Sequence, residues 1–313
     1  MEAAIRALPD KSCALDPLPT TQLKAVANVV VPFLAELFNR SLLNGSVPDV
    51  LKEAYITPRL KKSDLDPSDI SYCQISNLPV MSKLLERIVA KMLLNHLDRS
   101  QLLPRLQSAY RSKRSTETAL VKVLSDILLA IDSGDLAALV LSDLSAAFDT
   151  VDHAVLLRRL ETFGIRGTIH WFESYLIGRQ QHIRTPSTFS PPTVIECGVP
   201  QGSVLGLILF LLYVAAVQLL IEDCGLHLHH FADDTQKYGF CSPTPSSCTK
   251  LQSRISECID VASSWMRSHW LNTAKMGIIW LTLVDVSWVR PRGMEGRPKT
   301  WIVKSRAPVD SRF

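Results

Sequence analysis

Two adjacent carboxylates, Asp233 and Asp234, lie in the segment HHFADDTQKYGF, whose other residues are typical of a β-hairpin. One interpretation is a solvated turn, because Asp tolerates turn geometry and such pairs are common at loop tips. The other is chemical, since neighbouring carboxylates repel each other and either acquire a raised pKa or bind a cation. This segment alone leaves both interpretations open.

A third acid, Asp143, ends the short apolar segment LVLSD, which is predicted to be a buried strand. If that strand lies beside the HHFADD strand, Asp143 meets Asp233 and Asp234 at one edge of a sheet. Hard cations prefer such oxygen ligands, and two Mg²⁺ ions held by shared carboxylates can stabilise the attacking and leaving oxygens of a phosphoryl transfer. The three acids therefore indicate a candidate nucleotidyl-transfer site, provided that the strands are neighbours.

The composition indicates a globular chain with a substantial core. The chain has 313 residues, of which 47% are hydrophobic, which allows one large domain or two ordinary ones. The formal net charge is +4, and residues 277–313 alone supply it, with seven Lys or Arg against three acids. The rest of the chain is balanced, so the overall charge does not by itself indicate a nucleic-acid partner.

The cysteines form an odd set of seven without a C-x-x-C pair, which indicates neither a disulfide framework nor a zinc site. A reducing compartment is expected, in the nucleus or cytoplasm, and the N-terminal residues lack the apolar segment of a secretory signal. His227 and His229 would share one face of a strand, as metal ligands can. Because no third ligand stands at a suitable spacing, they are interpreted as strand residues.

One long segment without charge also has two interpretations. Val204–Ile221 is 18 residues long, the lower limit for a transmembrane helix. Gln218 lies within it, acids follow it and no Lys or Arg cluster flanks it, and these features argue against a membrane span. A buried core helix capped by Ser203 explains the same pattern, so this segment alone does not decide between the two.

Apolar periodicity places the other elements. Residues recurring at helical spacing predict helices at 33–45, 82–99, 151–164 and 251–265. Alternating or short apolar runs predict strands at 54–62, 139–143 and 277–283. No internal repeat or long linker interrupts this mixed pattern.

In chain order, these motifs resemble the reverse transcriptase of LINE-type retrotransposons, which lack long terminal repeats. The matching segments are SYCQISNLPVMSKLLERIV, QSAYRSKRSTETAL, LSDLSAAFDTVDH, GVPQGSVLG and FADDTQ, and their order and spacing agree from about Leu15 to about Lys275. One such motif is modestly specific, whereas the whole series in order is strongly so. In this family the GVPQG segment leads into a buried helix, which favours a core helix over a membrane span at Val204–Ile221.

The resemblance implies an α+β right-hand polymerase fold with fingers and palm, in which an antiparallel palm sheet packs on helices. It further implies that residues 1–135 form an N-terminal segment and the fingers, and that residues 136–283 form the palm of the reverse transcriptase domain. Residues 284–313 resemble nothing in the family, so we expect an unrelated basic tail that is poorly ordered. The thumb is expected to be incomplete or absent.

The same resemblance assigns roles to the three carboxylates and to one aromatic ring. Asp143 and Asp233 would hold two catalytic Mg²⁺ ions, and Asp234 would complete the cluster at the hairpin turn. Phe148 would lie beneath the sugar of the incoming nucleotide, where a ring leaves no room for a 2′-hydroxyl. The implied partners are an RNA template, a DNA primer and deoxynucleoside triphosphates, without a membrane.

Five further residues are assigned to substrate binding by the resemblance. Gln201 and Gly202 would line the template and nucleotide pocket, where glycine lets the backbone come close. Lys61 or Lys62 would meet the triphosphate as a point charge, and Lys275 would lie near the departing pyrophosphate. The three lysines equally fit solvated surface positions, since Lys is rarely buried.

Several residues depart from the family pattern. Where the family has arginine and proline after a tyrosine, this chain has Cys73 and Gln74, and cysteine cannot replace the triphosphate contact of the arginine. Ser142 stands at an apolar position of a buried strand, and Leu207 replaces a usual proline. Beside an active polymerase, two alternatives stay open: an inactive retrotransposon-derived remnant with weak nucleic-acid binding, and a membrane protein anchored by Val204–Ile221.

Restoring the two family residues should strengthen nucleotide binding. A charge-assisted hydrogen bond contributes about 1.5–3 kcal/mol, so we expect Cys73→Arg with Gln74→Pro to tighten deoxynucleotide binding by about one to two decades. Titration with a fluorescent deoxynucleotide measures the change, and Cys73→Ser with Gln74→Pro is the matched control without a guanidinium. Equal affinities of the two variants would contradict the assignment of position 73 to the triphosphate.

Overall fold

The computed structural model describes residues 1–10, 13–60, 72–103, 106–109, 111, 114–145, 147–185, 188–232, 234–269, 271–282 and 299–304. Their helices are α1 (Glu2–Arg6), α2 (Thr20–Ala25), α3 (Ala27–Leu43), α4 (Val80–Arg99), α5 (Thr116–Asp132), α6 (His153–Thr162), α7 (Ile169–Leu176), α8 (Val204–Asp223) and α9 (Pro245–Ser268). Their strands are β1 (Glu53–Leu60), β2 (Tyr72–Asn77), β3 (Leu136–Ser145), β4 (Gln180–Ile183), β5 (Thr193–Val194), β6 (His227–Phe231), β7 (Asp234–Cys241), β8 (Asn272–Thr282) and β9 (Lys299–Lys304).

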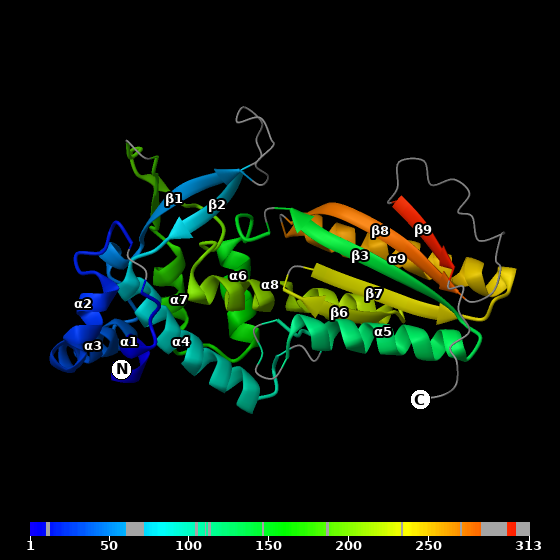
Figure 1. Cartoon of the computed structure of the whole chain (residues 1–313), viewed down its shortest axis with the longest axis horizontal. Helices are drawn as coiled ribbons and strands as arrows, with labels where there is room; N and C mark the ends of the chain where they lie inside the picture. Colours follow the sequence, from blue (N-terminus) through cyan, green and yellow to red (C-terminus); the bar gives the residue numbers. More distant parts are fainter. Residues whose placement is uncertain are drawn as a thin grey trace. The chain divides into compact units, whose positions relative to one another are not determined.

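The chain packs as two units, each with its own sheet (Figure 1). The first unit comprises Met1–Leu103 and Phe148–Tyr213, and the second comprises Pro104–Ala147 and Val214–Phe313. The strand order is β2-β1-β4-β5 in the first sheet and β6-β7-β3-β8-β9 in the second. The pairs β1–β4 and β8–β9 are parallel and the other neighbours are antiparallel. The fold is therefore a mixture of helices and sheets, as predicted.

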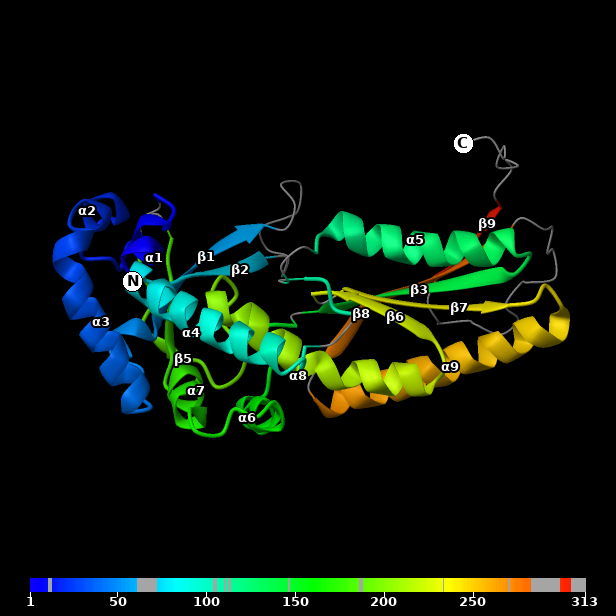
Figure 2. The same ribbon diagram turned by 90° about the horizontal axis from the view of Figure 1, so that it is seen from below.

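Helices cover both faces of the second unit's sheet, with α5 on one side and α9 on the other (Figure 2). On one face, buried β-branched residues of α5 pack against Ala137 and Tyr238. On the other face, a Cβ atom at Gly239 would lie 2.9 Å from the side chain of Leu251 in α9. The absence of a side chain at this position lets α9 pack closely on β7.

Helix α5 begins with a reciprocal cap. The Ser115 hydroxyl oxygen accepts the Thr118 N–H at 3.3 Å, and the Thr118 hydroxyl oxygen accepts the Ser115 N–H at 2.8 Å. This helix is not among those predicted from the sequence, although Ala119, Val123, Ile127 and Ile131 recur at helical spacing. Both its buried side and its exposed side carry aliphatic residues: Val123 and Ile127 on the first, Leu120, Leu124 and Leu128 on the second.

Helix α8 is the uncharged segment for which two interpretations stood open. Among the described helices, α8 is long and apolar enough to cross a membrane. However, 67% of its most apolar 18-residue stretch is buried inside the protein. The hydroxyl oxygen of Ser203 accepts the N–H of Gly206 at 2.8 Å, so the predicted cap is confirmed. Burial and capping support a core helix, and nothing in the described residues favours the membrane alternative.

Part of the predicted tail forms a strand, and the expectation of poor order stays a prediction. Residues Lys299–Lys304 form β9, which pairs in parallel with β8 at the edge of the second sheet. The sequence TWIV within β9 explains this, because β-branched and aromatic residues suit a strand that pairs with an open sheet edge. Residues 283–298 and 305–313 lie outside the described residues, and the division at 135/136 and 283/284 stays a prediction.

Lys237 is a buried amine in β7. It is 1% exposed, and its Nζ donates a hydrogen bond of 3.3 Å to the hydroxyl of Ser142. Burial lowers its pKa below the ordinary value of 10.5, because the charged form is desolvated. Between the folded and unfolded pKa values the unfolded chain binds more protons, so the contribution of this group to stability falls as pH falls.

We expect Lys237→Met to raise the free energy of unfolding by about 1–3 kcal/mol at neutral pH, because methionine fills similar space without a buried amine. The gain should shrink as pH rises toward the ordinary lysine pKa of 10.5. Urea unfolding at several pH values measures both effects, with Lys91→Met at an exposed position of α4 as control. A destabilised Lys237→Met protein would show that the buried amine makes a net favourable interaction.

Candidate active site

The GVPQG loop, residues 198–202 of the first unit, is tied to two other segments by backbone hydrogen bonds. The N–H of Val199 donates to the carbonyl oxygen of Phe148 at 2.7 Å. The N–H of Ser76 in β2 donates to the carbonyl oxygen of Gln201 at 2.8 Å. The loop is therefore held by hydrogen bonds to the turn at Phe148 and to the end of β2.

Two glycines of this loop have no room for a side chain. Gly198 has φ of +90°, and a Cβ atom there would lie 2.8 Å from the carbonyl oxygen of Asp149. Gly202 has φ of +116°, and a Cβ atom there would lie 2.6 Å from the carbonyl oxygen of Ser76. Both the conformation and the close backbone contact require glycine at these positions.

A small pocket of about 120 Å³ opens beside the loop. The polar residues that line it include Ser76, Asp149, Gln181 and Gln201, all in the first unit. Burial raises the pKa of the Asp149 carboxyl. Two amides, a hydroxyl and a carboxyl offer both donors and acceptors, so the pocket can hydrogen-bond a polar ligand.

The ring of Phe148 is half-buried and lies against α8. Its centroid is 4.7 Å from that of Phe210, with 39° between the ring planes. Contact with a fully buried ring limits the rotation of Phe148. Phe148, Gln201 and Gly202 are thus the predicted site residues that the first unit holds together through one loop.

The N-terminus of α8, which directly follows this loop, rests on a carboxylate from another helix. Glu86 of α4 is 1% exposed, and its Oε2 accepts the N–H of Val204 at 2.6 Å and of Leu205 at 3.3 Å. Its Oε1 accepts hydrogen bonds from Tyr175 at 3.2 Å and Ser82 at 3.4 Å. A carboxylate suits a helix N-terminus, because it accepts unpaired N–H groups and matches the positive end of the helix dipole.

A buried guanidinium completes this cluster. Arg179 is 1% exposed, donates from Nη1 to the carbonyl oxygen of Tyr175 at 3.0 Å, and lies 4.8 Å from the centre of the Tyr175 ring. Burial raises the pKa of Glu86, and the positive charge of Arg179 opposes that rise. Glu86 and Arg179 are not among the residues predicted from the sequence, because acids and arginines in amphipathic segments are usually solvated.

The predicted catalytic acids belong to the second unit. Strand β3 pairs with β7, the second strand of the hairpin, and the pairing ends at Ser142 and Thr235. Asp143 directly follows Ser142 and Asp234 directly precedes Thr235, so their backbones reach the same end of the sheet on neighbouring strands, about 5 Å apart. Asp143 also pairs with Lys275 of β8. Strand β3 therefore neighbours β7, the second strand of the hairpin, and not β6, the HHF strand beside which it was predicted to lie.

The hairpin turn itself has an unusual backbone. Phe231 pairs with Asp234, and Ala232, which begins the turn between them, has φ of +58°. This left-handed conformation costs a residue with a Cβ atom about 1–2 kcal/mol. Asp234 is exposed at the start of β7, whereas Asp233, Lys61 and Lys62 lie outside the described residues.

Among the side chains that the structure describes, no group of three or more His, Cys, Asp or Glu is arranged to hold an ion. That set leaves out Asp233 and the side chains of Asp143 and Lys275, so the predicted carboxylate cluster stays a prediction.

The strand histidines are structural. His229 is 5% exposed and its Nε2 is 2.9 Å from the hydroxyl of Ser108. His230 lies 3.0 Å from the Thr235 hydroxyl through Nδ1, and burial lowers its pKa to about 3. His227 and His229 both lie in β6, so the prediction that they are strand residues is confirmed.

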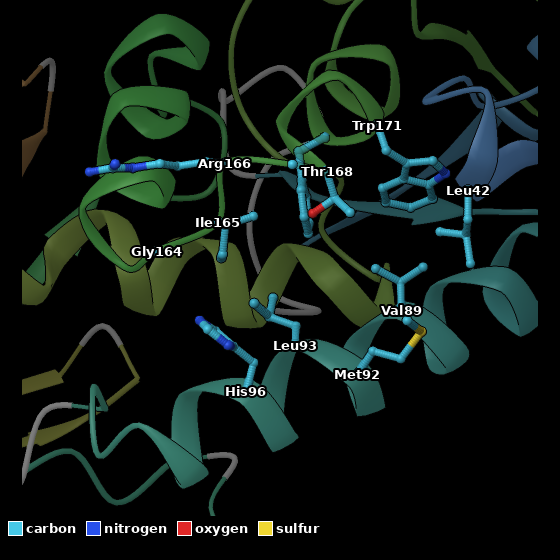
Figure 3. A pocket seen from close by; sticks show the side chains of 12 residues that line it. Leu42, Val89, Met92, Leu93, His96, Gly164, Ile165, Arg166, Thr168 and Trp171 are labelled. Carbon is cyan, nitrogen blue, oxygen red and sulfur yellow. The ribbon is translucent and has the colours of Figure 1, made fainter.

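A larger pocket, of about 250 Å³, lies elsewhere in the first unit. In Figure 3 the side chains of Val89, Leu93 and His96 rise from α4 toward Ile165 and Trp171 on the opposite wall. The lining is mainly apolar, and it includes none of the predicted site residues that the structure describes.

These features define a polymerase-like chain, and comparison with known proteins identifies its family. A family model described as reverse transcriptase (RNA-dependent DNA polymerase) matches residues 60–275. The match covers more than half of the chain, so the chain belongs to the reverse transcriptase family. Members of this family use divalent metal ions and act on a template, a primer and nucleotides.

The relatives confirm the resemblance to LINE-type retrotransposons. The chain is 32% identical over 213 residues to a probable RNA-directed DNA polymerase from transposon BS of Drosophila melanogaster, covering 68% of this chain and 24% of the relative. It is 27% identical over 259 residues to the RNA-directed DNA polymerase from mobile element jockey of Drosophila funebris, covering 82% of this chain and 28% of the relative. The chain thus spans about a quarter of the length of these relatives.

A solved structure supports the fold. Apo telomerase from Candida tropicalis, truncated from the C-terminal domain, matches with a TM-score of 0.52 and 13% sequence identity. The match covers 75% of this chain and 51% of that chain. The chain therefore has a polymerase fold of mixed helices and sheets, and this likeness carries no conclusion about activity.

We expect Glu86→Gln to loosen the GVPQG loop. The amide removes a charged acceptor from α8 and leaves Arg179 without its counter-charge, so the free energy of unfolding should fall by about 1.5–3 kcal/mol. Hydrogen exchange should accelerate at the amides of Val204, Leu205 and Ser76. Calorimetry and exchange mass spectrometry measure these effects.

The control is Glu173→Gln in α7, whose side chain is 50% exposed. It should leave stability and exchange nearly unchanged. If the two variants behaved alike, the Glu86 carboxylate would not be what holds α8 and the loop.

Proposed function

We propose that this chain carries the catalytic core of an RNA-directed DNA polymerase, with fingers within residues 1–135 and palm in residues 136–283. It would add deoxynucleotides to a primer 3′-hydroxyl on an RNA template. The observation that carries the proposal is the β3–β7 register, which brings the backbones of Asp143 and Asp234 to one end of a sheet on neighbouring strands. The family match from residue 60 to residue 275 supports it.

The acids would hold two Mg²⁺ ions. Carboxylate oxygens are the ligands that Mg²⁺ prefers, and Asp143, Asp233 and Asp234 supply them from a strand end and a hairpin turn. When bound, the ions would neutralise charge on the triphosphate and favour the attacking 3′-oxygen. The chain's own contribution is to fix these carboxylates on rigid strands, so that little reorganisation is needed during the reaction.

The loop and its neighbours would select and orient the nucleotide. Phe148, held against Phe210, would exclude a 2′-hydroxyl from the sugar position, since an aromatic ring beneath the sugar leaves no space for the extra oxygen. Gln201 and Gly202 would line the base and template side of the pocket. Lys61 or Lys62, and Lys275, would supply positive charge to the triphosphate and to the leaving pyrophosphate.

A second candidate function is nucleic-acid binding without polymerisation. Cys73 stands where the family has a phosphate-binding arginine, and this loss favours slower chemistry. Ser142 and Lys237, both buried in the sheet that carries the acids, are further polar groups at positions that suit apolar residues. A folded protein that binds its substrates weakly would fit both observations.

Primer extension on an RNA template with Mg²⁺ tests the proposal. We expect the Cys73→Arg, Gln74→Pro protein to extend a DNA primer, and the unmodified chain to extend it about one to two decades more slowly or not at all. Asp233→Asn in the restored background should abolish extension, because it removes a negative charge from the metal ligands. Asp260→Asn, at an exposed position of α9, is the control.

Extension that survives Asp233→Asn would overturn the metal-binding assignment. Nucleotide binding without extension in the restored protein would favour the second candidate.

A further inference from the structure

The sheet of the first unit carries a cluster of rings around one guanidinium. The Cζ of Arg184 lies 5.2 Å from the centre of the Tyr55 ring and 5.3 Å from the centre of the Phe189 ring. The rings of Tyr55 and His182 both meet Phe189 edge-on, with centroids 6.3 Å and 6.4 Å away. The guanidinium is thus positioned by aromatic rings rather than by an acid.

This ring cluster lies on the face of the sheet that points away from the small pocket. Tyr55 pairs with His182 across β1 and β4, and side chains of paired residues share a face. Arg184 follows His182 by two residues and bridges to Phe189, so both belong to the same face. Their neighbours Ile56 and Gln181 alternate to the other face and line the pocket.

The outermost member of the cluster is open to solvent. Phe189 is 51% exposed, whereas Tyr55 is 7% exposed and forms the floor beneath Arg184. The Asn77 amide donates to the Thr57 hydroxyl at 3.3 Å on the same face, which adds polar groups beside the rings. Glu53 is an acid on this face of β1, but no described carboxylate forms an ion pair with Arg184 within 4 Å.

We propose that this ring cluster binds an unpaired base and the adjoining phosphate of single-stranded nucleic acid. An exposed aromatic ring gives a base a surface on which to stack, and every base has such a face. A guanidinium held between rings keeps its charge for phosphate, which it binds through paired N–H donors. The site rests on the proposed function, because it names where an RNA strand would be held besides the nucleotide pocket.

The charge of Arg184 favours nucleic acid over a protein partner. A protein interface built around an exposed phenylalanine would bury the ring among aliphatic side chains and would leave the guanidinium to be desolvated. Stacking with a base covers the ring while the phosphate neutralises the guanidinium. Both groups of the cluster are then satisfied by one nucleotide.

The test is fluorescence anisotropy with a labelled, unstructured single-stranded RNA of about twelve nucleotides, without Mg²⁺ or nucleotide, using the full chain. Phe189→Leu keeps an apolar side chain but removes the ring, and it should weaken binding about five- to hundredfold. Phe189→Trp keeps an aromatic face and should bind as tightly as the unmodified chain or more tightly. Ile183→Ala, which is 50% exposed on the opposite face, should bind normally.

The role of Arg184 is tested by removing its charge. Arg184→Gln should weaken binding and reduce the salt dependence of the affinity by about one phosphate contact. Melting temperatures of all variants separate lost binding from lost folding. The proposal is overturned if Phe189→Leu binds as well as Phe189→Trp, if Ile183→Ala weakens binding as much as Phe189→Leu, or if the unmodified chain does not bind the RNA.

Failure of the polymerase proposal would look different. Binding that depends on Phe189 and Arg184, together with no primer extension by the restored protein, would retain this site and reject the enzymatic function. Extension without such binding would retain the polymerase and reject the ring cluster as a nucleic-acid site.

Discussion

The carboxylate of Glu86 is the interaction on which the described half of the candidate site depends. It accepts two N–H groups at the start of α8 while a phenol and a guanidinium hold it in place. The GVPQG loop ends where that helix begins, so the position of its glycines and of Gln201 follows from the position of the helix. Because the carboxylate is buried, its hydrogen bonds to the N–H groups of α8 are little screened. If the carboxylate were lost, no nearby water could take its place as acceptor.

The two sheets are used in different ways. Both faces of the second sheet are covered by helices, so chemistry there is confined to the ends of strands, which is where Asp143 and Asp234 lie. In the first sheet one face lines a polar pocket and the other carries an exposed ring cluster. Binding of small groups and binding of extended chains can therefore be served by opposite faces of the same strands.

Local patterns predict much of this, and long-range contacts account for what they miss. The cap at Ser203, the hairpin and the neighbouring strands of the acids follow from turn chemistry, apolar periodicity and the resemblance carried by ordered motifs. Helix α5 is missed because the exposed Leu120 and Leu124 directly follow the buried Ala119 and Val123 and broaden the apolar stripe beyond the buried side. Glu86 is missed for a different reason: in a helical pattern it reads as a solvated acid, and only the contact with α8, far along the chain, shows otherwise.

The parallel strand β9 has a consequence for how the chain behaves beyond its own fold. It covers the backbone of β8 along GIIWLT, an apolar stretch rich in β-forming residues. An uncovered strand of this kind exposes a row of free N–H and C=O groups, which is a template for pairing with another molecule. The backbone of β9 therefore occupies an edge of β8 that would otherwise be open to pairing with another molecule.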